Sequence, residues 1–244
     1  KQTERNSQTS NFNETRLATG TTPAASPSAA NNPTHSYDNF SLPTSGYYVL
    51  TINYYDDYSY TAAPTVPQTV GDGEIVFFNN TKKPKGLPTG KWTRVLANTI
   101  NEASAKKEIS YTFYDYKSRP ISTYVTNNLS TTSYIQTDVK YDFEGKILET
   151  KTRHKPSSDV AEITVRDYFT YSEQGRLLTH SNKVNSNPVQ LLADNTYNEL
   201  GQLIGKKIGN TIGSTPLQEV DYYYNIRGWL KSINDIAELG TDLF

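Results

Sequence analysis

The stretches YDFEGKI (residues 141–147), YSEQGRL (171–177), YNELGQL (197–203) and YNIRGWL (224–230) decide the fold, because they repeat one seven-residue pattern. Each heptad consists of a tyrosine, a small polar residue, two variable residues, a glycine, a sixth residue that is polar or basic in the first three copies, and an aliphatic residue. A fifth, degenerate copy is YDYKSRPI at residues 114–121, where Ser118 stands in the place of glycine. The tyrosines are 27, 30, 26 and 27 residues apart, and this nearly constant period predicts a repeat architecture.

Each heptad has the composition of a tight hairpin turn. A small polar residue followed three positions later by glycine is typical of a type I turn that ends in a left-handed residue with a G1 bulge. Glycine takes that conformation without the roughly 1–2 kcal/mol penalty of other residues. A looser or differently shaped turn is expected at Ser118. The predicted turn positions, each with its preceding tyrosine, are Tyr114 and Asp115; Tyr141, Asp142 and Gly145; Tyr171, Ser172 and Gly175; Tyr197, Asn198 and Gly201; and Tyr224, Asn225 and Gly228.

The residues that flank the turns alternate as in β-strands, with aromatic and β-branched side chains on one face. This pattern predicts an all-β fold of repeated antiparallel β-hairpins that pair side by side into one sheet. Helix signals are nearly absent, and the best candidate is the short segment at residues 236–244. The residues predicted to share a face are Ile135, Thr137, Val139 and Tyr141; Ile163, Val165, Phe169 and Tyr171, with Asp167 among them; and Val220, Tyr222 and Tyr224.

The chain divides by composition into three parts. Residues 1–45 are small, polar and punctuated by proline, which predicts a low-complexity loop or linker. Residues 46–108 form an irregular β segment, with strands expected at 46–55 and 74–79 and a loop at 82–90. Residues 109–244 hold the five hairpin repeats.

Composition narrows the classes of function. The 244 residues carry 24 Lys and Arg against 25 Asp and Glu, and a chain this close to neutral is not an obvious nucleic-acid binder. The absence of cysteine excludes disulfides, zinc-thiolate sites and thiol catalysis. No apolar run approaches the roughly 20 residues that span a bilayer. Since the chain also lacks methionine, we expect a processed chain or a piece of a longer one.

At the heptads the chain resembles the YD-repeat, or RHS-repeat, proteins of bacteria. The matching residues are Tyr141-Asp142 with Gly145-Lys146-Ile147 and their three full copies. The motifs YYDDY (residues 54–58) and GLPTG (86–90) resemble one branch of these proteins, so that the resemblance covers roughly residues 47–244. Departures from the family pattern are Ser118 for Gly, Ser172, Asn198 and Asn225 for Asp, and Trp229 for a basic residue.

The resemblance implies a spiralling β-sheet that forms part of a large hollow shell. In many bacterial members the shell encloses a C-terminal toxin, released by a self-cleaving core with an Asp-Pro type signature. This chain has no Asp-Pro dipeptide, so we expect that core and any toxin to lie beyond Phe244. The implied protein is secreted or at the bacterial cell surface. Its partners are the remainder of the shell and its cargo, with secretion machinery or a chaperone during export.

Two further readings compete with the shell. The tyrosine-rich strands could form a cell-surface adhesin or a glycan-binding module, because aromatic rings stack on pyranoses. An enzyme has no support, because His35, His154 and His180 are not near patterned acidic residues or serines. Asp56-Asp57 more often caps a turn than binds a metal. We expect the basic run at residues 81–85 to be a solvated loop and not a nucleic-acid patch, and GDGE at 71–74 is not a phosphate loop because no Lys-Ser or Lys-Thr follows it. We therefore predict no catalysis, no cofactor and no metal in this segment.

Overall fold

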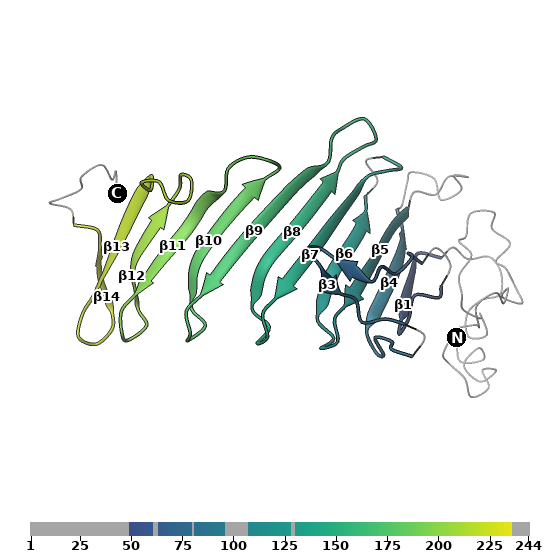
Figure 1. Cartoon of the computed structure of the whole chain (residues 1–244), viewed down its shortest axis with the longest axis horizontal. Coiled ribbons are helices and arrows are strands. Elements are labelled where there is room, and N and C mark those ends of the chain that lie inside the picture. The colour runs from purple at the N-terminus through teal and green to yellow at the C-terminus, as the bar shows by residue number, and fades with distance from the viewer. Residues whose placement is uncertain (1–48, 61–62, 80, 96–106, 128–129, 236–244) are drawn as a thin grey trace, which may run out of the picture. The chain divides into compact units, whose positions relative to one another are not determined.

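Figure 1 shows the computed structural model, which describes residues 49–60, 63–79, 81–95, 107–127 and 130–235. No helix occurs among these residues, and hence none long and apolar enough to cross a membrane. The predicted linker of residues 1–45 and the suggested helix at 236–244 lie outside the described residues.

The described residues form antiparallel β-strands. Twelve strands follow one another as a meander in the order β1-β4-β5-β6-β7-β8-β9-β10-β11-β12-β13-β14, and β2 pairs with β3 separately (Figure 1). The prediction of an all-β chain whose hairpins pair side by side is confirmed at this level. The strands are β1 (Thr51–Tyr55), β2 (Thr69–Val70), β3 (Glu74–Ile75), β4 (Pro88–Arg94), β5 (Lys107–Tyr114), β6 (Pro120–Thr126), β7 (Tyr134–Tyr141), β8 (Ile147–Lys155), β9 (Ile163–Tyr171), β10 (Leu177–Val184), β11 (Gln190–Tyr197), β12 (Leu203–Ile208), β13 (Gln218–Tyr224) and β14 (Leu230–Ile233).

The chain divides into two compact units. Unit 1 comprises residues 1–136 with 155–160, and unit 2 comprises residues 137–154 with 161–244. Unit 1 has an apolar core, whose buried residues are Ile52, Tyr54, Tyr58, Tyr60, Val70, Val76, Trp92, Phe113, Tyr114 and Ile121.

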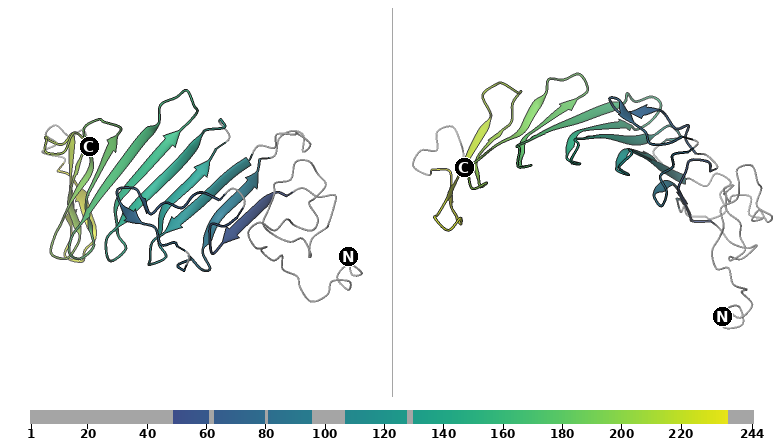
Figure 2. Two further views of the ribbon diagram at one scale, coloured as in Figure 1. Left: turned by 45° about the vertical axis from the view of Figure 1, so that its right-hand side comes forward. Right: turned by 60° about the horizontal axis from the view of Figure 1, so that its bottom comes forward.

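The core of unit 1 exists because residues 57–60, 63–79 and 81–85 fold over its sheet (Figure 2). The ring of Tyr58 packs against Phe113 of β5, with the ring centroids 5.1 Å apart. Tyr60 stacks on Tyr54 of β1 at 4.0 Å and lies directly over Gly90 of β4. A Cβ atom at Gly90 would overlap the phenol of Tyr60, so this contact requires glycine. The segment thus supplies a second layer that buries one face of β1, β4 and β5.

Unit 2 is a sheet with two chemically different faces. The register pairs His180 with Phe169 and Lys206 with Val220, which places the predicted aromatic and β-branched residues of β9 and β13 on one face. The opposite face carries ion pairs between neighbouring strands: Asp138 with Arg153 at 3.1 Å, Glu149 with Arg166 at 2.7 Å, and Lys207 with Glu219 at 3.6 Å.

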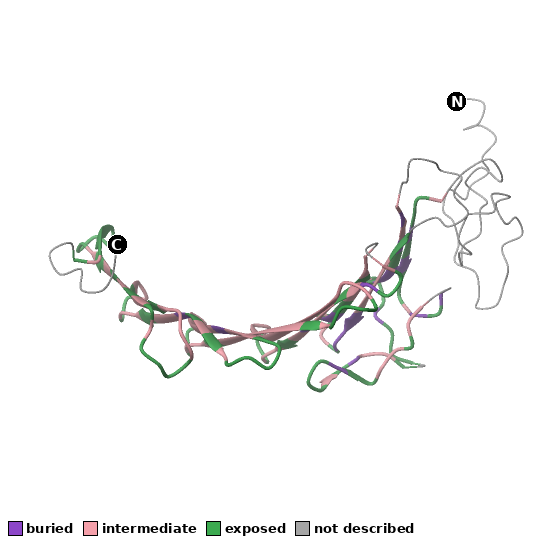
Figure 3. Ribbon diagram, turned by 90° about the horizontal axis from the view of Figure 1, so that it is seen from above, coloured by how far each residue is buried: buried purple, intermediate pink, exposed green. Residues whose placement is uncertain are grey.

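The described part of unit 2 buries almost no apolar side chain. Ala193 is the single buried apolar residue in the described part of this unit. Figure 3 shows its strands almost entirely in the colours of intermediate and exposed residues, whereas buried residues gather in unit 1. Unit 2 therefore has an amphipathic sheet without a core of its own.

Three expected elements in unit 1 differ from the structure. The strand expected at residues 46–55 begins only at Thr51 within the described range, and residues 46–48 lie outside that range. The strand expected at residues 74–79 ends at Ile75, because Phe77 turns away and donates its N–H to the carbonyl of Tyr114 at 2.8 Å. The loop expected at 82–90 is wrong at its end, since β4 begins at Pro88. Proline is acceptable there because the first residue of a strand can lack an N–H.

Candidate functional site: the turns and the repeat interface

The four full heptads form turns of one design. In the first, the N–H of Asp142 donates to the carbonyl of Lys146 at 2.9 Å, and the N–H of Gly145 donates to the carbonyl of Asp142 at 3.3 Å. The carboxylate Oδ1 of Asp142 also accepts from the N–H groups of Gly145 and Lys146, at 2.7 and 2.8 Å. The same backbone bonds recur at Ser172, Asn198 and Asn225.

The glycines of these turns are left-handed, as the heptads predict. Their φ angles are 103° at Gly145, 78° at Gly175, 81° at Gly201 and 80° at Gly228. The small polar residues hold the turns with their side chains: Oγ of Ser172 accepts from Arg176 N–H, and Oδ1 of Asn198 and Asn225 from the N–H groups of Gln202 and Trp229.

The expectation of a different turn at Ser118 is wrong. Ser118 has a φ of 63°, and its N–H donates to the carbonyl of Asp115 at 3.0 Å, as in the glycine copies. The side chain of Asp115 compensates for the missing glycine. It is nearly buried, accepts from the N–H groups of Lys117 and Arg119, and pairs with the guanidinium of Arg119 at 2.7 Å.

The charge on Asp142 is stabilised by its own turn. Desolvation alone would raise the pKa of this carboxyl, but the backbone N–H groups of Lys146 and Gly145 and the charge of Lys146 outweigh it, so the pKa falls below its usual value. Lys146 pairs with Glu144, which raises the pKa of the lysine.

In three of the four full heptads the opening tyrosine connects its hairpin to the preceding one. The hydroxyl of Tyr171 donates to the carbonyl of Ile147 at 2.9 Å, which is the last residue of the previous heptad. Tyr197 donates in the same way to Leu177 at 3.0 Å, and Tyr224 to Leu203 at 2.9 Å. The heptad tyrosine is therefore a contact between repeats as well as part of a turn.

The sixth residues Lys146, Arg176 and Gln202 make the reverse contact, toward the turn that follows. Lys146 lies over the ring of Tyr171 at 5.9 Å, and its Cε atom would be 2.9 Å from a Cβ at Gly175. Arg176 lies over the ring of Tyr197 at 5.9 Å and covers Gly201. Gln202 donates from Nε2 to the carbonyl of Gly228 at 3.4 Å. We call these paired contacts, tyrosine hydroxyl to carbonyl and sixth residue to glycine, the repeat interface.

Unit 1 contains a further copy of the turn that the sequence hides. Asp56 donates its N–H to the carbonyl of Leu87 at 3.1 Å, and its Oδ1 accepts from Gly86 N–H at 2.6 Å, as Asp142 does with Lys146 and Gly145. Gly86 has a φ of 76°, and Pro88 lies opposite Tyr55 after a register shift.

The repeat interface also extends to this hidden copy. The hydroxyl of Tyr114 donates to the carbonyl of Pro88 at 2.7 Å, which is the position that Ile147 occupies for Tyr171. Strands β1 and β4 are thus a repeat whose turn is interrupted by residues 57–85. The spacing could not reveal it, because the insertion separates Asp56 from Gly86.

Sequence reasoning also missed an asparagine cap at the far end of two hairpins. Asn185 and Asn234 have φ angles of 52° and 53°. Oδ1 of Asn185 accepts from Thr164 N–H at 2.9 Å, and Oδ1 of Asn234 accepts from Asp221 N–H at 2.8 Å. The available signal was an Asn directly after the return strand, a residue type that tolerates the left-handed region.

The histidines do not form a catalytic arrangement in the described residues. His180 Nε2 and Asn182 Nδ2 both lie 2.9 Å from Oδ1 of Asp167, and His180 stacks on Phe169 at 4.5 Å. This cluster provides hydrogen-bond partners for the carboxylate of Asp167, which interrupts the apolar face. His154 pairs across from Ile163 on β9, and His35 lies outside the described residues.

The acidic and basic loops have local roles in the described residues. Asp57 accepts from Ser59 and pairs with Lys83 at 3.3 Å, and Asp56 holds the turn described above. No group of three or more His, Asp or Glu side chains in the described ranges could hold a metal ion. Gly71 and Gly73 form the turn between β2 and β3.

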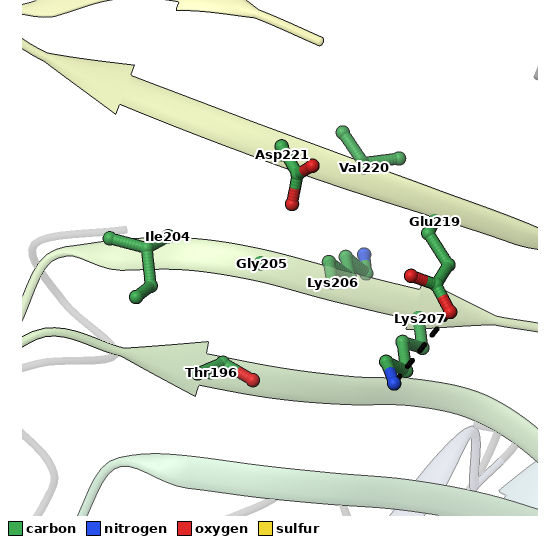
Figure 4. Close-up of a pocket in the computed structure, with 8 residues that line it drawn as sticks. All are labelled: Thr196, Ile204, Gly205, Lys206, Lys207, Glu219, Val220 and Asp221. Carbon is green, nitrogen blue, oxygen red and sulfur yellow. Dashed lines mark ion pairs between the residues drawn. The ribbon is translucent and has the colours of Figure 1, made fainter. Parts of the chain in front are cut away.

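A hollow on the unit 2 sheet lies over Gly205 of β12 (Figure 4). It has a volume of about 170 Å³ and exists because Gly205 has no side chain between Thr196 and Asp221. The Lys207–Glu219 ion pair lies beside it. Its lining has no nucleophile paired with a base, so the repeat interface remains the candidate functional feature of the chain.

No protein-family model matches the chain, and no curated protein matches it, so these comparisons assign it to no family.

Proposed function

We propose that the chain is a structural segment of a large secreted bacterial protein of the RHS/YD-repeat type. Its sheet continues into a spiralling shell that encloses or carries a C-terminal effector outside these residues. The partners of the segment are the rest of that shell and its cargo, with secretion machinery or a chaperone during export. The segment itself performs no catalysis and takes no cofactor.

The observation that carries this proposal is the repeat interface. The tyrosine hydroxyl contact occurs once in unit 1, from Tyr114 to Pro88, and three times in unit 2, at Tyr171, Tyr197 and Tyr224. In unit 2 it is accompanied by the sixth-residue contacts of Lys146, Arg176 and Gln202. Such contacts fix the position of each hairpin relative to the one before it. Further hairpins can therefore be added to the sheet through the same contacts, as in other repeat proteins.

The exposed apolar face of unit 2 also supports a larger assembly. A single-layer sheet with only partly buried Phe169, Tyr171 and Val220 leaves apolar area in water that another layer would bury at about 25 cal/mol per Å². A shell provides such a layer, because one face of its wall is turned inward. The charged ion pairs of the opposite face suit contact with water.

The glycan-binding alternative has less support from the tyrosines. In unit 1, Tyr111, Tyr124 and Tyr134 stack on one another with ring centroids 4.7 and 5.1 Å apart, so their faces are used within the protein. A sugar ring needs an exposed aromatic face.

The test uses the full-length secreted protein that contains this segment. We expect negative-stain electron microscopy to show closed hollow particles, and we expect the part after residue 244 to resist protease until the particle is opened. The double variant Gly175→Val/Gly201→Val removes two turns of the repeat interface and should give open or aggregated protein. Gly213→Val is the control, because no atom lies within 4 Å of its added Cβ. Extended, unclosed wild-type molecules would contradict the proposal.

A further inference from the structure

In the part of the chain that the structure describes, β13–β14 is the final hairpin of the sheet, and its half of the repeat interface has no partner there. Leu230 is the last residue of its heptad and corresponds to Ile147, Leu177 and Leu203, whose carbonyls each accept a tyrosine hydroxyl. Among the described residues no hydroxyl is bonded to the Leu230 carbonyl, and β14 has a neighbouring strand on one side only.

The sixth residue of this heptad is also exposed. Trp229 takes the place of Lys146, Arg176 and Gln202, each of which reaches the glycine of the following turn. Its indole is 65% exposed, with Arg227 over the ring at 5.9 Å. Leu230 and Ile233 are half exposed, so the edge offers apolar area next to the unused carbonyl.

We propose that β14, Trp229 and Leu230 form a docking edge for one further β-hairpin of the same repeat, recognised by a Tyr-Asx/Ser-x-x-Gly turn. The tyrosine hydroxyl of the incoming hairpin donates to the Leu230 carbonyl, and its glycine lies under the indole of Trp229. This inference rests on the proposed function and names the chemistry that the next part of the shell must have.

The partner follows from continuity with the interface already present. Four tyrosines, from Tyr114 to Tyr224, make the same contact with the preceding hairpin, and the incoming hairpin repeats it once more. Trp229 further restricts which hairpins can bind at this edge. An indole covers a glycine by packing alone, whereas Lys146 and Arg176 bring a charge, so the docking edge selects by shape and excludes a side chain at the glycine position.

The probe is a synthetic hairpin peptide of residues 163–185, closed by a disulfide between added terminal cysteines. It contains Tyr171, Gly175 and the cap Asn185. We expect saturable binding to the 244-residue chain in a fluorescence polarisation assay. A Tyr171→Phe peptide should bind roughly fivefold more weakly, as the loss of one hydrogen bond predicts. A Gly175→Ala peptide should also bind more weakly, because its Cβ meets the indole.

Variants of the chain locate the binding. The N–H of Asn234 points toward β13, because it donates to the carbonyl of Asp221 at 2.8 Å. The N–H of the preceding residue, Ile233, therefore points away from β13, toward the open edge. The variant Ile233→Pro removes this edge donor and breaks no hydrogen bond to β13. Ile233→Pro and Trp229→Ala should each abolish or strongly weaken binding, with unchanged circular dichroism. Ile226→Ala is the control: Ile226 is fully exposed in the same turn but lies off the edge.

Three outcomes would overturn the docking edge: no binding of the peptide, binding unaffected by Ile233→Pro and Trp229→Ala, or equal binding of all three peptides. A concentration-dependent dimer of the chain that Ile233→Pro abolishes would assign the edge to a second copy instead. Each of these results leaves the particle test on the full-length protein standing, so the two proposals can fail separately.

Discussion

The guanidinium of Arg176 covers Gly201, the left-handed glycine of the following turn, and a Cβ atom there would overlap it. The same guanidinium lies 5.9 Å from the ring centre of Tyr197. Gly201 is thus required twice, once by its φ of 81° and once by its neighbour. The turns at Gly175, Gly201 and Gly228 each lie against the sixth-residue side chain of the preceding heptad, so a side chain at any of these glycines would meet it.

Gly201→Ala should therefore cost more stability than the φ angle alone explains. The matched control is Gly213→Ala, whose φ of 85° is similar but whose Cβ would meet nothing within 4 Å. We expect about 1–2 kcal/mol for the control and about 0.5–1 kcal/mol more for Gly201→Ala, from the displaced cation–π contact. Urea denaturation measures both. Equal losses would show that Arg176 moves aside freely.

The tyrosine hydroxyls should contribute unequally, according to what else reaches their acceptor. Tyr171→Phe leaves the Ile147 carbonyl without its hydroxyl donor and should destabilise unit 2 by about 0.5–1.5 kcal/mol. Tyr197→Phe should cost less, because Asn195 Nδ2 still donates to the Leu177 carbonyl at 3.1 Å.

Tyr168→Phe serves as the control for these variants, since the hydroxyl of Tyr168 makes no hydrogen bond within the described part of the chain. Local amide exchange at β8 and β10, read by mass spectrometry, reports the effects. Equal changes in amide exchange for Tyr168→Phe and Tyr171→Phe would show that the Tyr171 hydroxyl does not stabilise the repeat interface.

The turn at Asp142 should respond to acid. Its pKa is lowered in the folded chain, so the stabilisation is fully present above the unfolded value of about 3.9 and is lost as pH falls through the folded value. Asp142→Asn should keep the turn, as Asn198 and Asn225 do, but lose this dependence. The amide resonance of Gly145, followed by NMR, should titrate in the wild type with a midpoint below the ordinary pKa of an aspartate carboxyl, and should not titrate in the variant. A midpoint at or above that ordinary value would contradict the lowered pKa.

The sequence predicts those parts of the fold that depend on local chemistry. Heptads with Asp142 or Asn198 and a glycine three residues later specify a turn whatever surrounds them, and alternation specifies the faces of β9 and β13. What escapes prediction depends on contacts far apart in the chain. Asp56 forms a turn with Gly86 although residues 57–85 separate them in the sequence, and no local period in the sequence indicates that contact.

The turn at Ser118 escapes for a related reason. Its left-handed backbone is held by the pairing of Asp115 with Arg119, so a side-chain contact offsets an unfavourable residue. The sequence also predicts only part of the repeat interface. The tyrosine and the sixth residue recur in the sequence, but the residues that they contact in the neighbouring hairpins are known only from the structure.

The two units should differ in stability, since only unit 1 has a core. Ile121 of β6 is 1% exposed, whereas Ala193 is the one buried apolar residue in the described part of unit 2. We expect amides of β5 and β6 to exchange much more slowly than those of β11–β13, because opening unit 2 exposes little new apolar surface. Hydrogen exchange by mass spectrometry on the purified chain tests this order.

A variant tests whether the slower amide exchange of unit 1 depends on its apolar core. Ile121→Ala creates a cavity and should cost about 2–5 kcal/mol, which would bring exchange in β4–β6 toward the rate of unit 2. Ile204→Ala, at a position 36% exposed on β12, is the control and should change exchange little. The chain alone should melt over a broad range, with unit 2 opening first. A single sharp transition with uniform protection would show instead that unit 2 draws its stability from within this segment, and the shell would no longer be needed to cover its apolar face.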